Sequence, residues 1–247
     1  MGVRATAIVL AGIPSTAVIP LPLTQLVTRR FRREDLLKRI HFMVPWARFC
    51  ARRILEVDLD VRGREHLPRR ARGTLYISNH QSYVDILILM EALGTAAFLS
   101  KRLIRYFPVL GRCAYCGGTV FMERGEKASR QAALEETLRM CQESTPVVVF
   151  PEGTRSADGE LREKIHPRAM HEAWRRGLRV IPVGLHGSHR VFPRTMDRLN
   201  LGERVAVRIG EPLDPACFQD GEAFAEACWG AVTELHREAK AVVVGSR

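Results

Sequence analysis

The 247-residue chain lacks the glycine-rich motifs that bind nucleotide phosphates, since it has neither a Walker loop nor a dinucleotide-binding fingerprint. It also lacks the G-x-S-x-G sequence that carries the nucleophile of many hydrolases. We therefore expect no nucleotide-driven reaction and no cofactor. Cysteine is scarce: the six cysteines lie mostly in apolar stretches, which excludes a secreted disulfide scaffold and favours a reducing compartment. Cys113 and Cys116 form a single CxxC pair, too few ligands for a zinc site, so no metal is expected.

Acidic residues are in the minority, with 27 against 38 basic residues and a net charge of +11. The excess is uneven, because residues 1–72 contain 15 basic and six acidic residues. This positive block flanks an apolar segment, a pattern that favours an anionic membrane surface as the partner. Paired Cys/His fingers and aromatic RNA-binding signatures are missing from the sequence, so we expect no nucleic-acid partner.

The first part of the chain is apolar and then basic. No charged residue lies among the 24 residues between Arg4 and Arg29. A straight helix of that length would span about 36 Å, more than the ~30 Å hydrocarbon core of a bilayer. Prolines at positions 14, 20 and 22 disfavour one straight helix. Residues 36–56 combine apolar residues at helical spacing with basic ones, which is typical of an amphipathic helix in a membrane interface.

Residues 1–56 are therefore predicted to form a membrane anchor, a broken pair of helices that dips into the bilayer without crossing it. Three alternatives fit the same residues. A single transmembrane helix would place the arginine-rich side in the cytoplasm. A signal peptide would be removed from the mature protein. An apolar helix could instead be buried in the globular core.

The rest of the chain alternates between strand and helix patterns. Residues 57–73 are charged and contain two glycines and a proline, so they are predicted to be an irregular linker. Residues 74–247 are predicted to form an α/β domain with a central mixed sheet flanked by helices. Strands are expected at residues 74–78, 96–99, 119–122, 146–150, 178–183 and 205–209. Helices are expected at residues 83–93, 101–107, 126–142, 168–176 and 223–244.

The sequence Asn-His-Gln-Ser-Tyr-Val-Asp at residues 79–85 follows a predicted strand and opens a predicted helix. His80 is a natural general base because its ordinary pKa lies near neutrality. Asp85 is placed to accept a hydrogen bond from one ring nitrogen, which would direct the other nitrogen at a substrate hydroxyl. The alternative is a loop histidine and a helix-start aspartate with no joint role.

A second motif, Phe-Pro-Glu-Gly-Thr-Arg-Ser at residues 150–156, follows another predicted strand. Loops at the carboxyl ends of strands are where open α/β sheets bind ligands. Gly153 permits close approach of the backbone, and the planar guanidinium of Arg155 suits a phosphate. Glu152 is suited to accept a hydrogen bond from a polyol hydroxyl or to hold Arg155. The alternative is an ordinary polar turn with an internal salt bridge.

Two further positions bear on the site. Arg124 follows the strand expected at residues 119–122, so with His80 and Arg155 it would form a basic mouth for an anionic substrate; alone, such an arginine is often a solvated surface residue. His186 and His189 flank a Gly-Ser turn and are expected to be loop residues and not ligands.

In this order, the motifs resemble those of the glycerolipid acyltransferases, in particular the lysophosphatidate (1-acylglycerol-3-phosphate) acyltransferase branch. The family's NHxxxxD block matches residues 79–85, and its F-P-E-G-T-R block matches residues 150–155 without change. Its second block ends a strand with an arginine, matched by Arg124. Its fourth block, a hydrophobic strand containing proline, matches residues 180–183. The resemblance covers residues 70–210 and implies a glycerol-3-phosphate acyltransferase-like fold.

The resemblance also implies a mechanism. His80, oriented by Asp85, would take the proton from the free hydroxyl of a lysophospholipid, and that oxygen would attack the thioester of acyl-CoA or acyl-carrier protein. The residues expected to hold the glycerol-phosphate end are Arg124, Glu152, Gly153, Thr154 and Arg155. The N-terminal helices resemble the family's membrane-associated hairpin. A soluble thioester donor implies the cytoplasmic face, and we expect a bacterial inner membrane.

One stretch departs from the family pattern. Members often carry Phe-Lys-x-Gly after the third block, where this chain has Ile-His-Pro-Arg at residues 165–168. That loop borders the acceptor site in the family, so the head group is open: lysophosphatidate, another lysophospholipid or a lyso-aminolipid. A lipid-binding protein of the same fold without catalytic activity is a further alternative.

Overall fold

The computed structural model describes residues 36–69, 72–94, 96–106, 114–115, 117–123 and 125–245. Its described strands form one seven-stranded sheet in the order β1-β7-β6-β2-β5-β3-β4. Neighbouring strands are parallel except β6 and β7, which are antiparallel, so the sheet is mixed as predicted. The strands are β1 Asp58–Arg62, β2 Thr74–Ser78, β3 Ala97–Lys101, β4 Val120–Met122, β5 Val147–Val149, β6 Arg179–His186 and β7 Arg204–Ile209.

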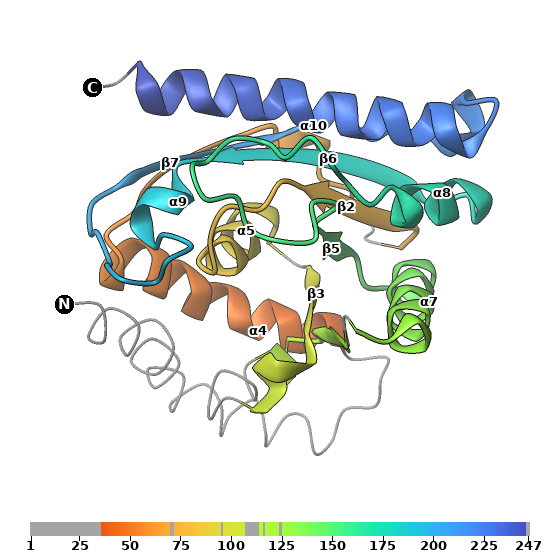
Figure 1. The fold of residues 1–247 in the computed structure, drawn as a ribbon, viewed down its shortest axis with the longest axis horizontal. Coiled ribbons are helices and arrows are strands. Elements are labelled where there is room, and N and C mark those ends of the chain that lie inside the picture. Colours follow the sequence, from red (N-terminus) through yellow and green to blue (C-terminus); the bar gives the residue numbers. More distant parts are fainter. Residues whose placement is uncertain are drawn as a thin grey trace.

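Helices cover both faces of the sheet (Figure 1). The α-helices are α4 Leu36–Phe49, α5 Asp85–Leu93, α7 Lys127–Glu143, α8 Arg168–Arg175, α9 Ser188–Val191 and α10 Gly221–Val244. A π-helical turn, Cys50–Ile54, continues α4, and short 3-10 turns occupy Arg64–His66, Arg102–Tyr106 and Pro215–Cys217. Figure 1 shows α10 running along one face of the sheet and α4 and α5 lying on the opposite face.

The central strands are buried on both sides because their side chains alternate between two cores. In β2, Leu75 and Ile77 join the core under α7, α8 and α10, while Tyr76 joins the core under α4 and α5. In β5, Val148 lies in the core opposite to that of its two valine neighbours. Such fully buried strands read as short apolar runs, which is why their positions were predicted correctly from the sequence.

The prediction of an irregular linker at residues 57–73 was wrong for its first part. Asp58–Arg62 forms β1, the edge strand, which pairs in parallel register with β7. Leu59 is buried, while Asp58 and Arg62 are exposed. The charged residues that suggested a linker therefore belong to the solvent side of an edge strand, where charge is common.

Of the helix expected at residues 36–56, residues 36–54 are helical, but one face is buried in the protein. Met43, Ala47 and Cys50 are at most 1% exposed and belong to the same core as α5. The helix therefore packs in the way that the buried-helix alternative expected for this part of the chain. Within the described residues, no helix is both long and apolar enough to cross a membrane. The membrane anchor was predicted for residues 1–56, and residues 1–35 of that segment lie outside the described part.

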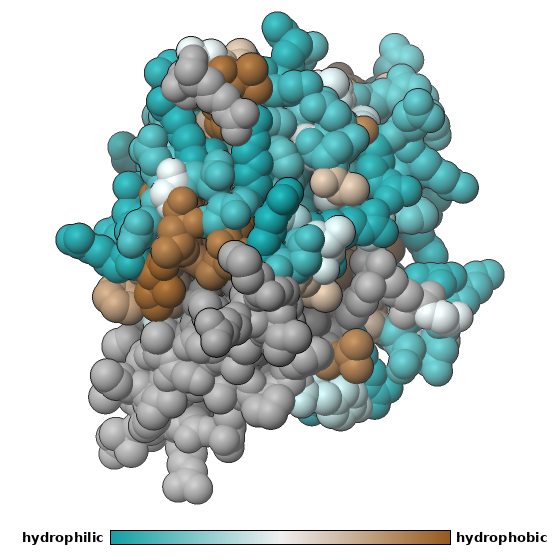
Figure 2. All heavy atoms as spheres, turned by 60° about the vertical axis from the view of Figure 1, so that its left-hand side comes forward, coloured by the Kyte–Doolittle hydropathy of each residue, from teal (hydrophilic) through white to brown (hydrophobic). Residues whose placement is uncertain are grey.

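The face of the molecule in Figure 2 is mostly hydrophilic over the described residues, with small separate apolar patches. The large apolar side chains that are exposed are Phe49, Leu103, Tyr106, Tyr115, Leu201 and Val244.

Close contact between β6 and α10 gives a test of the packing. A Cβ at Gly184 would lie 2.2 Å from the backbone nitrogen of His236 in α10. We expect Gly184→Ala to lower the free energy of unfolding by about 3 kcal/mol, because backbone atoms cannot move aside cheaply. Gly230→Ala is the matched control: a Cβ there meets nothing within 4 Å, so alanine should stabilise α10 by about 0.5–1 kcal/mol. Urea unfolding measures both, and equal effects would contradict the packing.

Candidate active site

His80 and Asp85 form a hydrogen-bonded pair where β2 gives way to α5. Nδ1 of His80 lies 2.8 Å from Oδ2 of Asp85, the fully buried first residue of α5. The same oxygen accepts from the backbone N–H groups of Gln81, at 2.7 Å, and Ser82, at 2.9 Å. Because Oδ2 already accepts from these two N–H groups, Nδ1 of His80 is the donor in the third bond, and Nε2 is the ring nitrogen that Asp85 leaves unused. The predicted hydrogen bond between His80 and Asp85 is therefore present in the structure.

The loop after β5 holds His80 on several sides. The imidazole stacks on Phe150, with ring centroids 4.1 Å apart and an interplanar angle of 16°. The His80 backbone N–H donates to Oε1 of Glu152 at 3.1 Å, and its carbonyl accepts from the Ser156 N–H at 2.7 Å. The two sequence motifs therefore meet at His80, as the parallel pairing of β2 with β5 requires.

Three polar residues around His80 fix the turn itself. Asn79 bonds both the N–H and the carbonyl of Leu185 in β6, each at 2.9 Å. The amide of Gln81 donates to the Gly159 carbonyl at 2.7 Å, and the Ser82 hydroxyl donates to the Phe192 carbonyl at 2.6 Å. These roles were not found from the sequence, because only the order of strands in the sheet brings β6 beside the turn.

Glu152 has a different partner from the one that its spacing suggested. Its carboxyl is buried and bonds the backbone of His80, while Oε2 has no hydrogen-bond partner among the described residues. Burial raises the pKa of Glu152 to about 8, and the nearby charge of Asp85 acts in the same direction. Glu152 is thus mostly protonated at neutral pH, and its free oxygen can donate a hydrogen bond.

Arg155 lies flat on an aromatic ring, with its guanidinium carbon 3.8 Å from the centroid of Tyr83. Its Nη1 is buried and has no hydrogen-bond partner within the described structure. Burial lowers the pKa of Arg155, and the positive charge of Arg194 lowers it further. A half-buried guanidinium with a buried donor that no described residue uses is expected to bind an anion.

His80, Tyr83 and Arg155 line one pocket of about 190 Å³, which we call the histidine pocket. His80, Arg155 and Arg194 are the basic residues of its described lining, and none of the described residues that line it is a carboxylic acid. Gly153 and Thr154 form part of the wall, and Gly153 adopts a positive φ of 64° that favours glycine. Its apolar lining includes Ile86, Leu99, Met122 and Phe150.

Arg194 was missed by the sequence analysis. It follows α9 in a loop that carries no recognisable motif, and a Pro-Arg pair gives no signal of its own. By contrast, the predicted Arg124 lies outside the described residues, as do Cys113 and Cys116. Among the residues that the structure does describe, no group of three or more His, Cys, Asp or Glu side chains is arranged to hold a metal.

His186 is not in a loop, contrary to the sequence-based expectation. It is the last residue of β6 and is buried, and its Nδ1 lies 3.2 Å from Nε2 of His236 in α10. Burial lowers the pKa of His186 to about 3, so the ring is neutral. His236 in turn bonds the Gly159 carbonyl at 2.9 Å. Through this bond the two histidines hold the loop that follows β5 against β6 and α10.

Comparison with known proteins agrees with this geometry. Residues 58–186 match the family model described as "Acyltransferase". This chain belongs to the acyltransferase family. Its fold is that of the crystal structure of the 1-acyl-sn-glycerophosphate acyltransferase PlsC from Thermotoga maritima, with a TM-score of 0.77, 24% identity and 98% of each chain covered.

Curated members of the acyltransferase family include proteins with two kinds of name. A chloroplastic 1-acyl-sn-glycerol-3-phosphate acyltransferase of Brassica napus is 32% identical over 209 residues, which are 82% of this chain and 58% of that protein. A lyso-ornithine lipid O-acyltransferase of Pseudomonas aeruginosa is 36% identical over 141 residues, 56% of this chain and 50% of that protein. The chain thus spans between half and three fifths of the length of these two relatives.

The buried carboxyl of Glu152 makes stability depend on pH. Because its pKa is raised from 4.5 to about 8, the folded state binds more protons than the unfolded state across that window, and stability falls as pH rises through it. Glu152→Gln keeps the acceptor for the His80 N–H and cannot ionise. We expect wild type to lose more than about 1 kcal/mol relative to this variant between pH 5 and 8.5 in urea unfolding. A difference that stays constant with pH would contradict the assignment.

Proposed function

We propose that the protein is an O-acyltransferase that moves an acyl group from a thioester donor to the free hydroxyl of lysophosphatidate, giving phosphatidate. The observation that carries the proposal is the histidine pocket, where the oriented base His80 faces the same space as Arg155 and Arg194. A base and two guanidiniums suit an acceptor with a hydroxyl close to a phosphate. The name of the Brassica napus relative supports the same acceptor.

In the proposed reaction, Nε2 of His80 takes the proton from the acceptor hydroxyl as its oxygen bonds to the thioester carbonyl carbon. Asp85 holds the ring and stabilises the imidazolium that forms. When the tetrahedral intermediate collapses, the carbon–sulfur bond breaks and the leaving thiolate takes the proton from the imidazolium. The products are an ester and a free thiol, and no covalent acyl-enzyme is needed.

The acceptor phosphate is assigned to Arg155 and Arg194. A phosphate monoester carries close to two negative charges near pH 7, which matches two guanidiniums in a pocket without a described acidic residue. A lyso-ornithine lipid head group is a zwitterion with a single carboxylate, so it would leave one guanidinium uncompensated. Its enzyme in Pseudomonas aeruginosa is nevertheless a relative, and this acceptor is therefore the second candidate.

The remaining proposals concern the membrane contact of the chain, its cellular location and the binding roles of three motif residues. Residues 1–56 are proposed to contact the membrane, on the basis of their charge pattern and the half-exposed Phe49 at the end of α4. The catalytic domain would then work on the cytoplasmic face of a bacterial inner membrane, where a soluble thioester donor is present. The binding roles of Arg124, Gly153 and Thr154 remain proposals drawn from the family motifs.

Loss of the base should stop the reaction. We expect His80→Ala to lower kcat by about 10³-fold and Asp85→Asn by about 10²-fold, the range that general-base catalysis supplies. Thiol release from palmitoyl-CoA in the presence of lysophosphatidate measures both. His171→Ala on α8 is the matched control and should keep wild-type activity. Turnover by His80→Ala within a few-fold of wild type would refute the mechanism, and no turnover by wild type with any thioester would favour the non-catalytic lipid-binding alternative.

Arg194 should act on the acceptor. Arg194→Gln is expected to raise KM for lysophosphatidate about tenfold, on the order of 1.4 kcal/mol, with little change in kcat. Arg198→Gln, an exposed arginine in the same loop that does not line the pocket, should leave KM unchanged. The measurement compares lysophosphatidate with a lyso-ornithine lipid. A wild-type preference for the zwitterionic acceptor would overturn the assignment of the phosphate to the two arginines.

A further inference from the structure

We propose that a basic groove beside the histidine pocket binds the phosphate groups of the thioester donor, in the form of coenzyme A. This inference rests on the proposed function, because it assigns the second substrate of the same reaction. The groove has a volume of about 670 Å³ and lies along the loop after β5 and the starts of α7 and α8. We call it the donor groove.

The donor groove is open, basic and partly apolar. Its described lining includes four cationic side chains, all on exposed residues: Arg130, Arg162, Lys164 and Arg168. Glu152 is the one acidic residue among those described, and its raised pKa of about 8 leaves it mostly neutral at pH 7. Basic residues therefore outnumber acidic ones in the described lining of the groove. The diphosphate and 3′-phosphate of coenzyme A together carry close to four negative charges, so the two are complementary.

The two substrates differ in how far their phosphates lie from the atom that reacts, so their phosphates need different binding sites. In lysophosphatidate the phosphate is only a few bonds from the free hydroxyl, so it must bind in the histidine pocket with His80. In coenzyme A the thioester is separated from the diphosphate by the pantetheine arm, whose length is that of four to five extended residues, about 15 Å. The donor phosphates must therefore bind outside the histidine pocket.

The donor groove meets this requirement. His80 does not line it, yet it shares five lining residues with the histidine pocket, among them Phe150, Gly153 and Thr154. Its buried end is also near the base, because Oε1 of Glu152 lies 3.1 Å from the backbone nitrogen of His80. A pantetheine arm passing Gly153, where a side chain would reach the ring of His166 at 3.0 Å, would connect the exposed cations to the reacting carbonyl.

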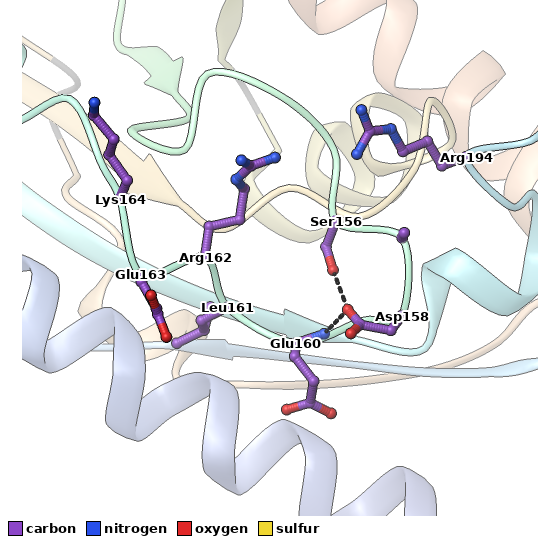
Figure 3. Close-up of a pocket in the computed structure, with 9 residues that line it drawn as sticks. Ser156, Asp158, Glu160, Leu161, Arg162, Glu163, Lys164 and Arg194 are labelled. Carbon is purple, nitrogen blue, oxygen red and sulfur yellow. Dashed lines mark hydrogen bonds between the residues drawn. The ribbon is translucent and has the colours of Figure 1, made fainter.

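A third hollow, of about 390 Å³, joins the two basic regions (Figure 3). Arg194 lines both this hollow and the histidine pocket, while Arg162 and Lys164 line both this hollow and the donor groove. Three of the described residues that line it are acidic: Asp158 accepts from the Ser156 hydroxyl, Glu160 pairs with Lys240 at 2.6 Å, and Glu163 is exposed. Basic side chains therefore occur on the acceptor side, in this hollow and on the donor side, and in the hollow an equal number of described acidic residues accompanies them.

This assignment differs from the one that the family resemblance suggests for residues 165–168, which border the acceptor site in related proteins. In this chain Arg168 lies in the donor groove and not in the histidine pocket. The replacement of the usual Phe-Lys-x-Gly stretch would then alter how the donor is bound.

The test compares donors that differ only in their phosphates: palmitoyl-CoA, its 3′-dephospho form and palmitoyl-pantetheine, each with lysophosphatidate in detergent. The double variant Arg162→Gln/Lys164→Gln should raise KM for palmitoyl-CoA about tenfold, the effect of losing two charge-assisted contacts. It should leave KM for lysophosphatidate within about twofold and leave kcat/KM for palmitoyl-pantetheine at the wild-type value. Added NaCl should raise the wild-type KM for palmitoyl-CoA more steeply than that of the variant.

Arg179→Gln is the matched control, since this exposed arginine begins β6 at the opposite end of the strand from His186. A rise in KM for lysophosphatidate alone would overturn the proposal and assign the groove to the acceptor. Equal losses with palmitoyl-CoA and palmitoyl-pantetheine would overturn it, and so would an effect confined to palmitoyl-acyl-carrier protein. Calorimetric titration with coenzyme A keeps the test independent of turnover. Binding that the double variant loses supports the groove even if the proposed reaction fails, and no binding to wild type overturns it.

Discussion

Oδ2 of Asp85 accepts three hydrogen bonds, from the ring of His80 and from the backbone N–H groups of Gln81 and Ser82. One buried carboxylate oxygen thus closes the turn between β2 and α5 and also sets which ring nitrogen carries the proton. The turn cannot change shape without breaking these three bonds. The orientation of the base is therefore a property of the turn and not of a mobile side chain.

The sheet then brings a second loop to this turn. β2 and β5 are parallel neighbours, so the loops at their carboxyl ends lie at one edge, where Glu152 and Ser156 bond the backbone of His80. β6 lies on the other side of β2 and holds Asn79 through Leu185. The chain that leaves β6 continues through α9 to Arg194. The segments that follow these three strands thereby contribute lining residues to the histidine pocket, and β3 and β4 contribute others.

The distribution of charge separates two classes of anion. Arg155 is partly buried against Tyr83 and lines the same pocket as His80, where we propose that the acceptor phosphate binds. The cations of the donor groove are exposed and farther along the loop, where long side chains can follow an extended, flexible molecule. A lysophospholipid and a coenzyme A thioester differ in this same respect, since one has its phosphate beside the reacting atom and the other has its phosphates a pantetheine arm away. The proposed reaction and the proposed donor site are linked by that difference.

What the sequence determined by itself is local. The buried strands β2 and β5 are apolar runs, α7 shows helical periodicity, and the spacing of His80 and Asp85 across one strand-to-helix turn predicted their hydrogen bond. The tertiary structure decided what depends on contacts between distant residues. Glu152 bonds a residue 72 positions away, and β1 is a strand because β7 lies beside it. Arg194 enters the histidine pocket only through the path of the chain after β6. Neighbouring residues determine the hydrogen bonds and the side-chain periodicity within one turn. Strand order and register depend instead on packing over the whole core.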